Sequence, residues 1–222
     1  MIYLTDKQIR LYISLLFIGW LVAILYFDLT SYLAFALGIL IPLLQRIVSL
    51  DEAKKIEEFT KLGLLRVLPH RDDEEHYRKR IQKTKRKLFI MGHTSKRLIE
   101  DFADENGRVE KRVLLEALSR GVSVKILIAH KSYLSENKLN DYEQTMRKMN
   151  KIKEKFDKFE FKYYKHIPSH SLFLFDNECL LGPIFTELES RDTPTLDMKY
   201  DCEFAEKYLE HFNIEWSKAV EH

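Results

Sequence analysis

Apolar residues fill two uncharged runs near the start of the chain, over residues 11–27 and 32–44, with a polar break at residues 28–31. Each run is near the short end of the roughly 17 to 25 residues that a membrane-spanning helix needs. Aromatic side chains gather near the run ends, as they do at a membrane–water interface. The pattern predicts a transmembrane helical hairpin over residues 1–48, with a buried helical hairpin in a larger core as the alternative.

Cations flank this predicted hairpin on one side only. Lys7 and Arg10 precede it, Arg46 and the lysines of residues 54–61 follow it, and the break between the two runs carries only Asp28. Because positively charged flanks stay in the cytoplasm, we expect a multi-pass protein of the inner (cytoplasmic) membrane. Both termini and any folded domain after the hairpin are then cytoplasmic.

Residues 49–62 have the pattern of a helical stalk. Leu50, Ala53, Ile56 and Phe59 recur at intervals of three along one face, and acidic residues occupy the first turn, where the helix dipole favours them. The apolar stripe packs on the domain that follows or mediates self-association. The pattern leaves both interpretations open.

From residue 63 onward, short apolar runs alternate with amphipathic charged segments. Strands are expected over residues 64–68, 88–92, 122–129, 159–164 and 172–175, with an edge strand over 198–202. Helices are expected over residues 72–87, 95–102, 109–120, 140–156 and a closing segment that ends at 219. This order predicts an α/β domain over residues 63–222, built as a layered mixed sheet flanked by helices.

Two apolar runs flank the turn-forming cluster Asp176, Asn177 and Glu178, so residues 169–183 are predicted to form a β-hairpin. The run 172–175 is apolar at every position, which indicates a strand buried on both faces in the middle of the sheet. The polar residues that precede it therefore lie at the rim of a covered sheet.

Composition narrows the function classes. The net charge is +2, so the chain has no strong overall field for nucleic acid, although a nucleic-acid partner stays open. The two cysteines, Cys179 and Cys202, form neither a metal-ligand pair nor a disulfide framework, and no metal or other cofactor is expected. A reducing compartment suits the folded domain.

The predicted hairpin resembles the signature of the phospholipase D superfamily, which reads His-x-Lys, four residues, Asp, and then a second strand ending in Gly-Ser. Counting back from Asp176 puts Ser169 at the position of the His and Ser171 at that of the Lys. His170 is one residue out of register, and Pro183 stands where the family has Ser. The signature is thus degenerate, and its phosphate-holding Lys is absent.

Two further segments resemble the same family. Residues 119–128 are similar to its helix end and following Val-x-Val-x-Ile-Leu strand, and residues 211–219 to its closing Phe-x-x-x-Trp helix. Only one copy of the signature is present. In the family, single-copy members pair so that two signatures face each other, so the resemblance implies a homodimer. If activity is retained, the resemblance also implies that His170 and Asp176 are catalytic. His170 is then the nucleophile, and a histidine of the partner subunit protonates the leaving oxygen.

Polar residues follow several of the predicted strands. Strands 88–92 and 122–129 should be parallel, so their carboxyl ends share one sheet edge, where open α/β sheets usually bind ligands. If the hairpin is arranged as in the family, its start lies at the same edge. The side chains expected to form a phosphate-binding pocket there are His93, Thr94, Ser95, His130, Lys131, His166, Ser169 and Ser171.

These features support two hypotheses. The first is a membrane-anchored, catalytically degenerate phospholipase D-like domain that acts as a binding, sensing or effector module for a phosphate-bearing small molecule or a nucleotide. The alternative is an active dimeric phosphodiesterase, a phospholipase or nuclease, at the membrane. The basic residues 78–87 either contact anionic membrane lipid, at about 1 kcal/mol per cation, or form a solvated face offset by the acidic residues 72–75.

Overall fold

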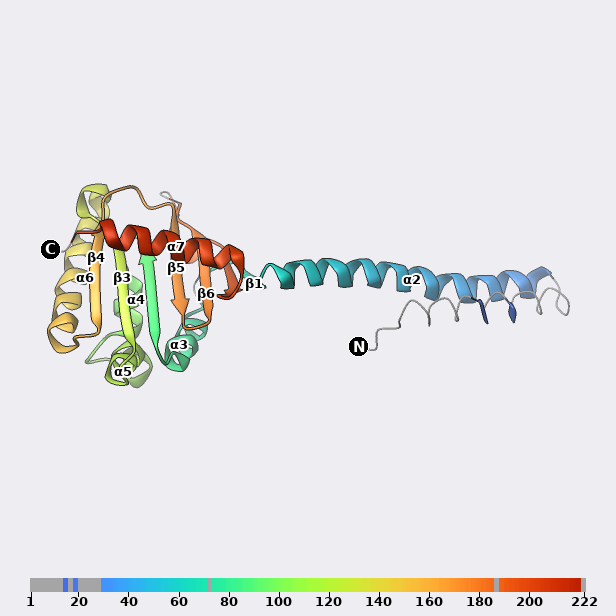
Figure 1. The fold of residues 1–222 in the computed structure, drawn as a ribbon, viewed down its shortest axis with the longest axis horizontal. Helices are drawn as coiled ribbons and strands as arrows, with labels where there is room; N and C mark the ends of the chain where they lie inside the picture. The colour runs from blue at the N-terminus through green and yellow to red at the C-terminus, as the bar shows by residue number, and fades with distance from the viewer. Residues whose placement is uncertain (1–13, 16–17, 20–28, 72, 186–187, 221–222) are drawn as a thin grey trace. The chain divides into compact units, whose positions relative to one another are not determined.

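The computed structural model describes residues 14–15, 18–19, 29–71, 73–185 and 188–220 (Figure 1). The chain forms two compact units, residues 1–58 and 59–222.

The first unit is dominated by helix α2 (Leu29–Lys61), which continues into the start of the second unit. It spans both the second apolar run and the predicted stalk without interruption, and it contains Pro42. The first apolar run, residues 11–27, lies outside the described residues apart from the helical pairs 14–15 and 18–19. In the part of the chain that is described, no helix combines the length and the apolar character needed to cross a membrane.

The second unit is built on a sheet of seven strands. They are β1 (Leu64–Leu68), β2 (Lys87–Gly92), β3 (Ser123–Ala129), β4 (Phe159–Tyr164), β5 (His170–Phe175), β6 (Glu178–Pro183) and β7 (Thr195–Lys199). Their order across the sheet is β1-β7-β6-β5-β2-β3-β4. Strands β2, β3 and β4 are parallel to one another, and the other neighbouring pairs are antiparallel. The mixed sheet and the parallel pairing of the strands before His93 and His130 are therefore confirmed.

The predicted position of one strand was wrong, both along the chain and in the sheet. The strand expected at the edge over residues 198–202 is β7, which starts at Thr195 and lies between β6 and β1. Strand β1 covers it through antiparallel pairing, so β1 and β4 are the edges of the sheet. Residues 200–202 instead form the turn into the last helix, where the Cys202 sulfur accepts a hydrogen bond from the Ala205 N–H at 3.4 Å.

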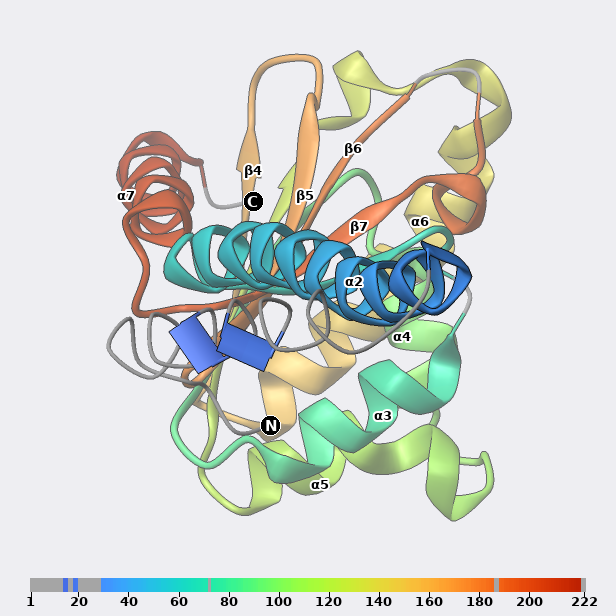
Figure 2. The ribbon, with the colours of Figure 1, turned by 90° about the vertical axis from the view of Figure 1, so that its right-hand side faces the viewer.

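Helices pack on both faces of the sheet. They are α3 (Glu74–Lys83), α4 (Lys96–Phe102), α5 (Val113–Ser119), α6 (Glu136–Lys155) and α7 (Glu203–Lys218), with short 3₁₀ turns η1 (Val109–Arg112), η2 (Lys131–Tyr133) and η3 (Ser190–Asp192). Residues of α3, α4, α5 and α6 form one hydrophobic core with the sheet, and α7 forms a second core on the opposite face (Figure 2).

Strand β5 lies at the centre of the sheet and contributes to both cores. Leu172 and Leu174 pack in the α7 core, whereas Phe173 and Phe175 belong to the core on the other face. The prediction of a strand buried on both faces is confirmed. Because successive side chains of a strand point to opposite faces, this alternation also separates His170 from Ser171.

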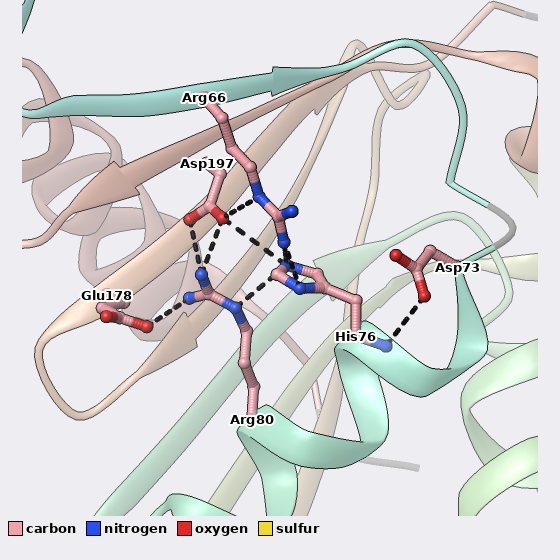
Figure 3. Close-up of polar contacts among 6 residues, drawn as sticks. All are labelled: Arg66, Asp73, His76, Arg80, Glu178 and Asp197. Atoms are coloured by element: carbon pink, nitrogen blue, oxygen red, sulfur yellow. Dashed lines mark hydrogen bonds and ion pairs between the residues drawn. The ribbon is translucent and has the colours of Figure 1, made fainter.

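A closed polar network holds the outer strands to α3 (Figure 3). Asp197 on β7 is 1% exposed; it accepts hydrogen bonds from Arg66 Nε at 3.0 Å and from Arg80 Nη2 at 2.7 Å. Arg80 Nη1 also reaches Glu178 Oε2 at 2.5 Å, and His76 Nε2 lies 3.5 Å from the Asp197 carboxylate. Each arginine of this network is paired with a carboxylate, so the network attaches β1 and α3 to the sheet. It leaves no unpaired charge among these arginines and carboxylates for a ligand.

Candidate phosphate-binding site

A cavity of about 730 Å³ opens at the carboxyl end of β2, on the sheet face covered by α3 to α6. Its lining includes residues 92–98, which follow β2, the start of α6 and residues 183–185 and 188–191, which follow β6. Ser171 and Phe173 of β5 also line it. Cavities of about 300 to 1,000 Å³ are typical of small-molecule sites.

Arg71 is the most unusual side chain of this cavity. It lies between β1 and α3 and is only 8% exposed. Its Nε donates to Thr195 Oγ1 at 2.7 Å and its Nη2 donates to the carbonyl oxygen of Pro183 at 2.5 Å. No described carboxylate forms an ion pair with it. Burial lowers the pKa of its guanidinium, but an arginine stays charged in a protein, so this is a buried cation without a counter-ion among the described residues.

Gly182 makes room for that guanidinium. A Cβ placed on Gly182 would collide with Arg71 Nη2 and would lie 2.6 Å from the carbonyl oxygen of Pro194. Gly182 pairs with Ser171 across β5 and β6, and Ser171 Oγ donates to the Gly182 carbonyl oxygen at a long 3.4 Å. The glycine at the end of the hairpin thus allows Arg71 to reach the sheet beside a seryl hydroxyl.

His93 and Lys138 form a second polar element of the cavity. The Nζ of Lys138 lies 3.3 Å from His93 Nδ1. Burial first, and the nearby Lys138 charge second, lower the pKa of His93 to about 4, so the imidazole is neutral at pH 7. A lysyl ammonium can only donate, which assigns the imidazole proton to Nε2. His93 is therefore a hydrogen-bond donor at Nε2.

Hydroxyl groups complete this part of the site. Ser95 has a left-handed backbone with φ of 55°, a conformation that a residue other than glycine rarely adopts. Its Oγ is buried and has no hydrogen-bond partner in the described structure. Thr94 Oγ1 accepts a long 3.4 Å bond from the Lys96 N–H, which leaves its own hydrogen free to donate. Phosphate oxygens accept from such groups.

The remaining cations of the cavity lining already have carboxylate partners. Lys96 pairs with Asp141 at 3.0 Å, Arg97 with Asp101 at 3.7 Å and Arg191 with Glu189 at 2.7 Å. Among the described lining residues, Arg71 and Lys138 are the two cations with no such ion pair. Positive charge available to an anion is thus concentrated at these two side chains.

The structure brings together four of the side chains predicted for the pocket: His93, Thr94, Ser95 and Ser171. His170 lies on the opposite face, where its ring contacts Tyr208 and His211 of α7 at centroid distances of 5.2 and 5.1 Å. Its Nδ1 lies 3.0 Å from the hydroxyl oxygen of the adjacent, exposed Ser169, and its Nε2 is shielded from solvent without a partner. Both residues line a separate cavity of about 430 Å³.

Three other predicted side chains are also outside the cavity. His166 Nε2 bonds Glu215 of α7 at 3.0 Å, His130 Nδ1 bonds the Ser132 hydroxyl at 2.7 Å, and Lys131 is exposed on η2. Of the three histidines predicted for the pocket, the structure places His93 in this cavity and His130 and His166 outside it. The three histidines lie at the same end of the strands, but their side chains are divided between the two faces of the sheet.

Asp176 lies at the far end of β5 from the cavity. Its carboxylate accepts hydrogen bonds from the backbone N–H groups of Lys85, Arg86 and Lys87 at 2.7 to 3.1 Å. Partial burial acts to raise its pKa, but these three N–H groups outweigh burial and lower the pKa below its usual value. Asp176 attaches the hairpin turn to the start of β2, so it holds the hairpin in position against that strand.

Neither Arg71 nor Lys138 was predicted from the sequence as a residue of the site. Arg71 belongs to a short charged connection, and Lys138 lies in the first turn of α6, which begins at Glu136 rather than at the predicted residue 140. The one usable signal was Gly182, the glycine of the degenerate signature, since a required glycine indicates a close approach by another group. Sequence spacing could not identify the group that approaches.

No protein-family model matches the chain, and no curated protein matches it either. Solved structures that are similar include TrmBL2, an archaeal chromatin protein, with a TM-score of 0.49 and 16% identity over 88% of this chain and 72% of that one. Nuc from Salmonella typhimurium, a phospholipase D family member, has a TM-score of 0.47 and 16% identity over 71% and 97%. NucT from Helicobacter pylori has a TM-score of 0.48 and 15% identity over 71% and 96%.

Proposed function

We propose that the chain is a binding module for a phosphate-bearing ligand and that the cavity containing Arg71 is its site. The observation that carries the proposal is a guanidinium that is nearly fully buried and has no carboxylate partner in the described part of the chain. Burying a charge is costly unless it is paired. A phosphate is a partner that a guanidinium fits well, because its oxygens can accept two parallel N–H bonds from the planar fork.

The rest of the cavity supports a phosphate group in the same place. Lys138 supplies a second cation, His93 a neutral N–H donor, and Ser95 and Ser171 supply hydroxyls that form no short hydrogen bond to the protein. Together these groups replace the family's phosphate-holding Lys with a different set of donors. Hydrogen bonds that involve a charged group contribute about 1.5 to 3 kcal/mol each.

The geometry favours binding over catalysis. His170, the expected nucleophile, has its Nε2 shielded from solvent and lies on the α7 face, away from the cavity that holds Arg71. The lone pair of His93 Nδ1 faces Lys138, and its Nε2 carries the proton, so neither nitrogen is poised to attack phosphorus. The alternative of a dimeric phosphodiesterase therefore finds no histidine placed as its nucleophile among the described residues of the cavity.

We further propose that this module is held at the inner membrane by residues 1–48, as a homodimer with both termini in the cytoplasm. The support is the sequence pattern and the single degenerate signature. Arg71 is separated from helix α2 only by β1 and a few connecting residues. An anion that binds Arg71 therefore acts on the segment that leads directly to the proposed membrane anchor, which is what a sensing role requires.

Isothermal titration of the full chain in detergent with ribose 5-phosphate and with inorganic phosphate tests the binding function. We expect both to bind, and Arg71→Gln to weaken the affinity at least tenfold, about 1.4 kcal/mol. Arg147→Gln, which removes an exposed arginine of α6 outside the cavity, should bind as the parent does. Equal affinity of the parent and Arg71→Gln would overturn the proposal, as would phosphodiester hydrolysis that is abolished by His170→Ala.

A further inference from the structure

We infer that the phosphate-bearing ligand is a mononucleotide, whose phosphate lies at Arg71 and whose base lies against Phe185. This inference rests on the proposed function and adds the chemical class of the ligand. Three features of the cavity carry it: its size, the side chains at its rim and its balance of charge.

Size comes first. A single phosphate needs only a few donors and a small volume, whereas this cavity measures about 730 Å³. Cavities of this volume match small organic ligands with a body attached to the polar group. The ligand is therefore larger than inorganic phosphate.

The rim of the cavity provides an exposed apolar surface. Phe185 and Leu188 line the cavity, yet they are 46% and 49% exposed. Isolated exposed apolar residues are common, but these two belong to the segment after β6 and open into the same cavity as Arg71. An aromatic side chain that is half exposed can stack on a flat heterocycle, and such stacking does not depend on which base the nucleotide carries.

Charge excludes the larger phosphate ligands. Among the described residues, five cationic side chains and five carboxylates line the cavity, so its net charge is near zero with His93 neutral. The carboxylates are Glu74, Glu100, Asp101, Asp141 and Glu189. Arg71 and Lys138, the two described lining cations without a carboxylate partner, can neutralise one phosphate, but the lining has no surplus of cations for the repeated charges of a nucleic-acid strand. Carboxylate oxygens instead accept hydrogen bonds from ribose hydroxyls and from the amino groups of bases.

A phospholipid headgroup would present the same phosphate, but its acyl chains need a continuous apolar surface. The described apolar residues at the rim are confined to the few that follow β6, and five carboxylates line the same cavity. A nucleotide, which combines one charged group, several hydroxyls and one flat ring, fits this lining better.

Titration calorimetry on the full chain in detergent distinguishes the ligand classes. The probes are ribose 5-phosphate, the four ribonucleoside 5′-monophosphates and a short-chain phosphatidic acid. We expect at least one nucleotide to bind tenfold or more tightly than ribose 5-phosphate. Phe185→Ala should reduce that nucleotide to the affinity of ribose 5-phosphate and leave the sugar phosphate unchanged. Phe204→Ala, which removes an aromatic ring of similar exposure on α7, is the matched control and should change neither.

The outcomes separate this inference from the function on which it rests. If ribose 5-phosphate binds through Arg71 but no nucleotide binds more tightly, or Phe185→Ala has no effect, the nucleotide inference fails and the phosphate site stands. If phosphatidic acid binds more tightly than every nucleotide and depends on Arg71, the ligand is a lipid headgroup. If no probe binds, or Arg71→Gln changes nothing, both proposals fail together.

Discussion

At the scale of single residues, the proposed function depends on one buried charge. Arg71 is 8% exposed and its guanidinium contacts a hydroxyl and a carbonyl oxygen, both neutral groups. A buried charge with only neutral partners destabilises a fold, and replacing such groups by apolar side chains of similar length is often neutral or stabilising. A residue that is unfavourable for stability indicates selection for another property, here the binding of an anion.

The substitution Arg71→Met tests this separation of stability and binding. We expect the unliganded variant to have a free energy of unfolding equal to that of the parent or up to about 2 kcal/mol higher. Ribose 5-phosphate should raise the melting temperature of the parent and not that of the variant, because only the parent offers the guanidinium. Thermal unfolding with and without ligand measures both effects. A variant that is much less stable than the parent without ligand would mean that Arg71 is a structural residue.

Histidine side chains give the fold a predictable response to acid. Burial, the first cause in each case, lowers the pKa of His93 to about 4 and also lowers the pKa of His76 and His170. In the unfolded chain these groups titrate near pH 6.5, so the unfolded state binds more protons between about pH 4 and pH 6.5. Stability therefore rises with pH across this window and falls as the solution is acidified.

Urea denaturation at pH 7.5 and pH 5.0 measures this effect. The midpoint should be lower at pH 5.0, and His93→Gln should reduce the difference between the two, since glutamine can still accept a hydrogen bond from Lys138 without titrating. An unchanged midpoint in the parent would mean that these imidazoles are protonated as easily in the fold as in solvent.

At the scale of elements, the hairpin of β5 and β6 decides which side chains meet. Adjacent residues of β5 belong to opposite faces, so Ser171 lines the cavity and His170 packs against α7. At the end of β6, Gly182 leaves the space that Arg71 occupies. The proposed phosphate binding thus depends on the hairpin residues Ser171 and Gly182 and on Arg71, rather than on His170 or Asp176.

Gly182→Ala tests the hairpin's contribution. The added methyl group would collide with Arg71 Nη2 and with the Pro194 carbonyl, so we expect a loss of about 1 to 3 kcal/mol of stability and a loss of ribose 5-phosphate binding. Gly92→Ala, at the end of β2 beside the same cavity, would meet only Ser95 Oγ at 3.8 Å and should keep the binding. Calorimetry and denaturation of both variants compare the two positions. Full binding by Gly182→Ala would show that Arg71 does not need this position.

At the scale of the whole molecule, the proposed role needs the folded unit to be attached to a membrane. Residues 11–27 and 32–44 carry no charge, and hydrocarbon accepts such runs readily. The attachment we propose precedes β1, and Arg71 follows β1 along the chain. The site and the proposed anchor are therefore neighbours in sequence.

Extraction of membranes tests the attachment. Bacterial membranes that contain the full chain are washed with 1 M salt and then at alkaline pH, conditions that release proteins bound by charge alone. We expect the chain to stay in the membrane pellet and to be released by detergent. Release by the salt wash would indicate attachment through surface cations, such as those of residues 78–87. Release into the soluble fraction without any wash would contradict the anchor.

The sequence alone determined the second unit's elements, because the period of apolar residues is local information. It predicted the mixed sheet, the parallel pairing of β2 and β3, the buried central hairpin and the cavity positions of His93, Ser95 and Ser171. Only the tertiary structure decided the face of the sheet on which each polar side chain lies, since a shift of one residue along a strand moves a side chain to the opposite face. It also brought in Arg71 and Lys138, whose approach depends on packing between distant segments that no local pattern records.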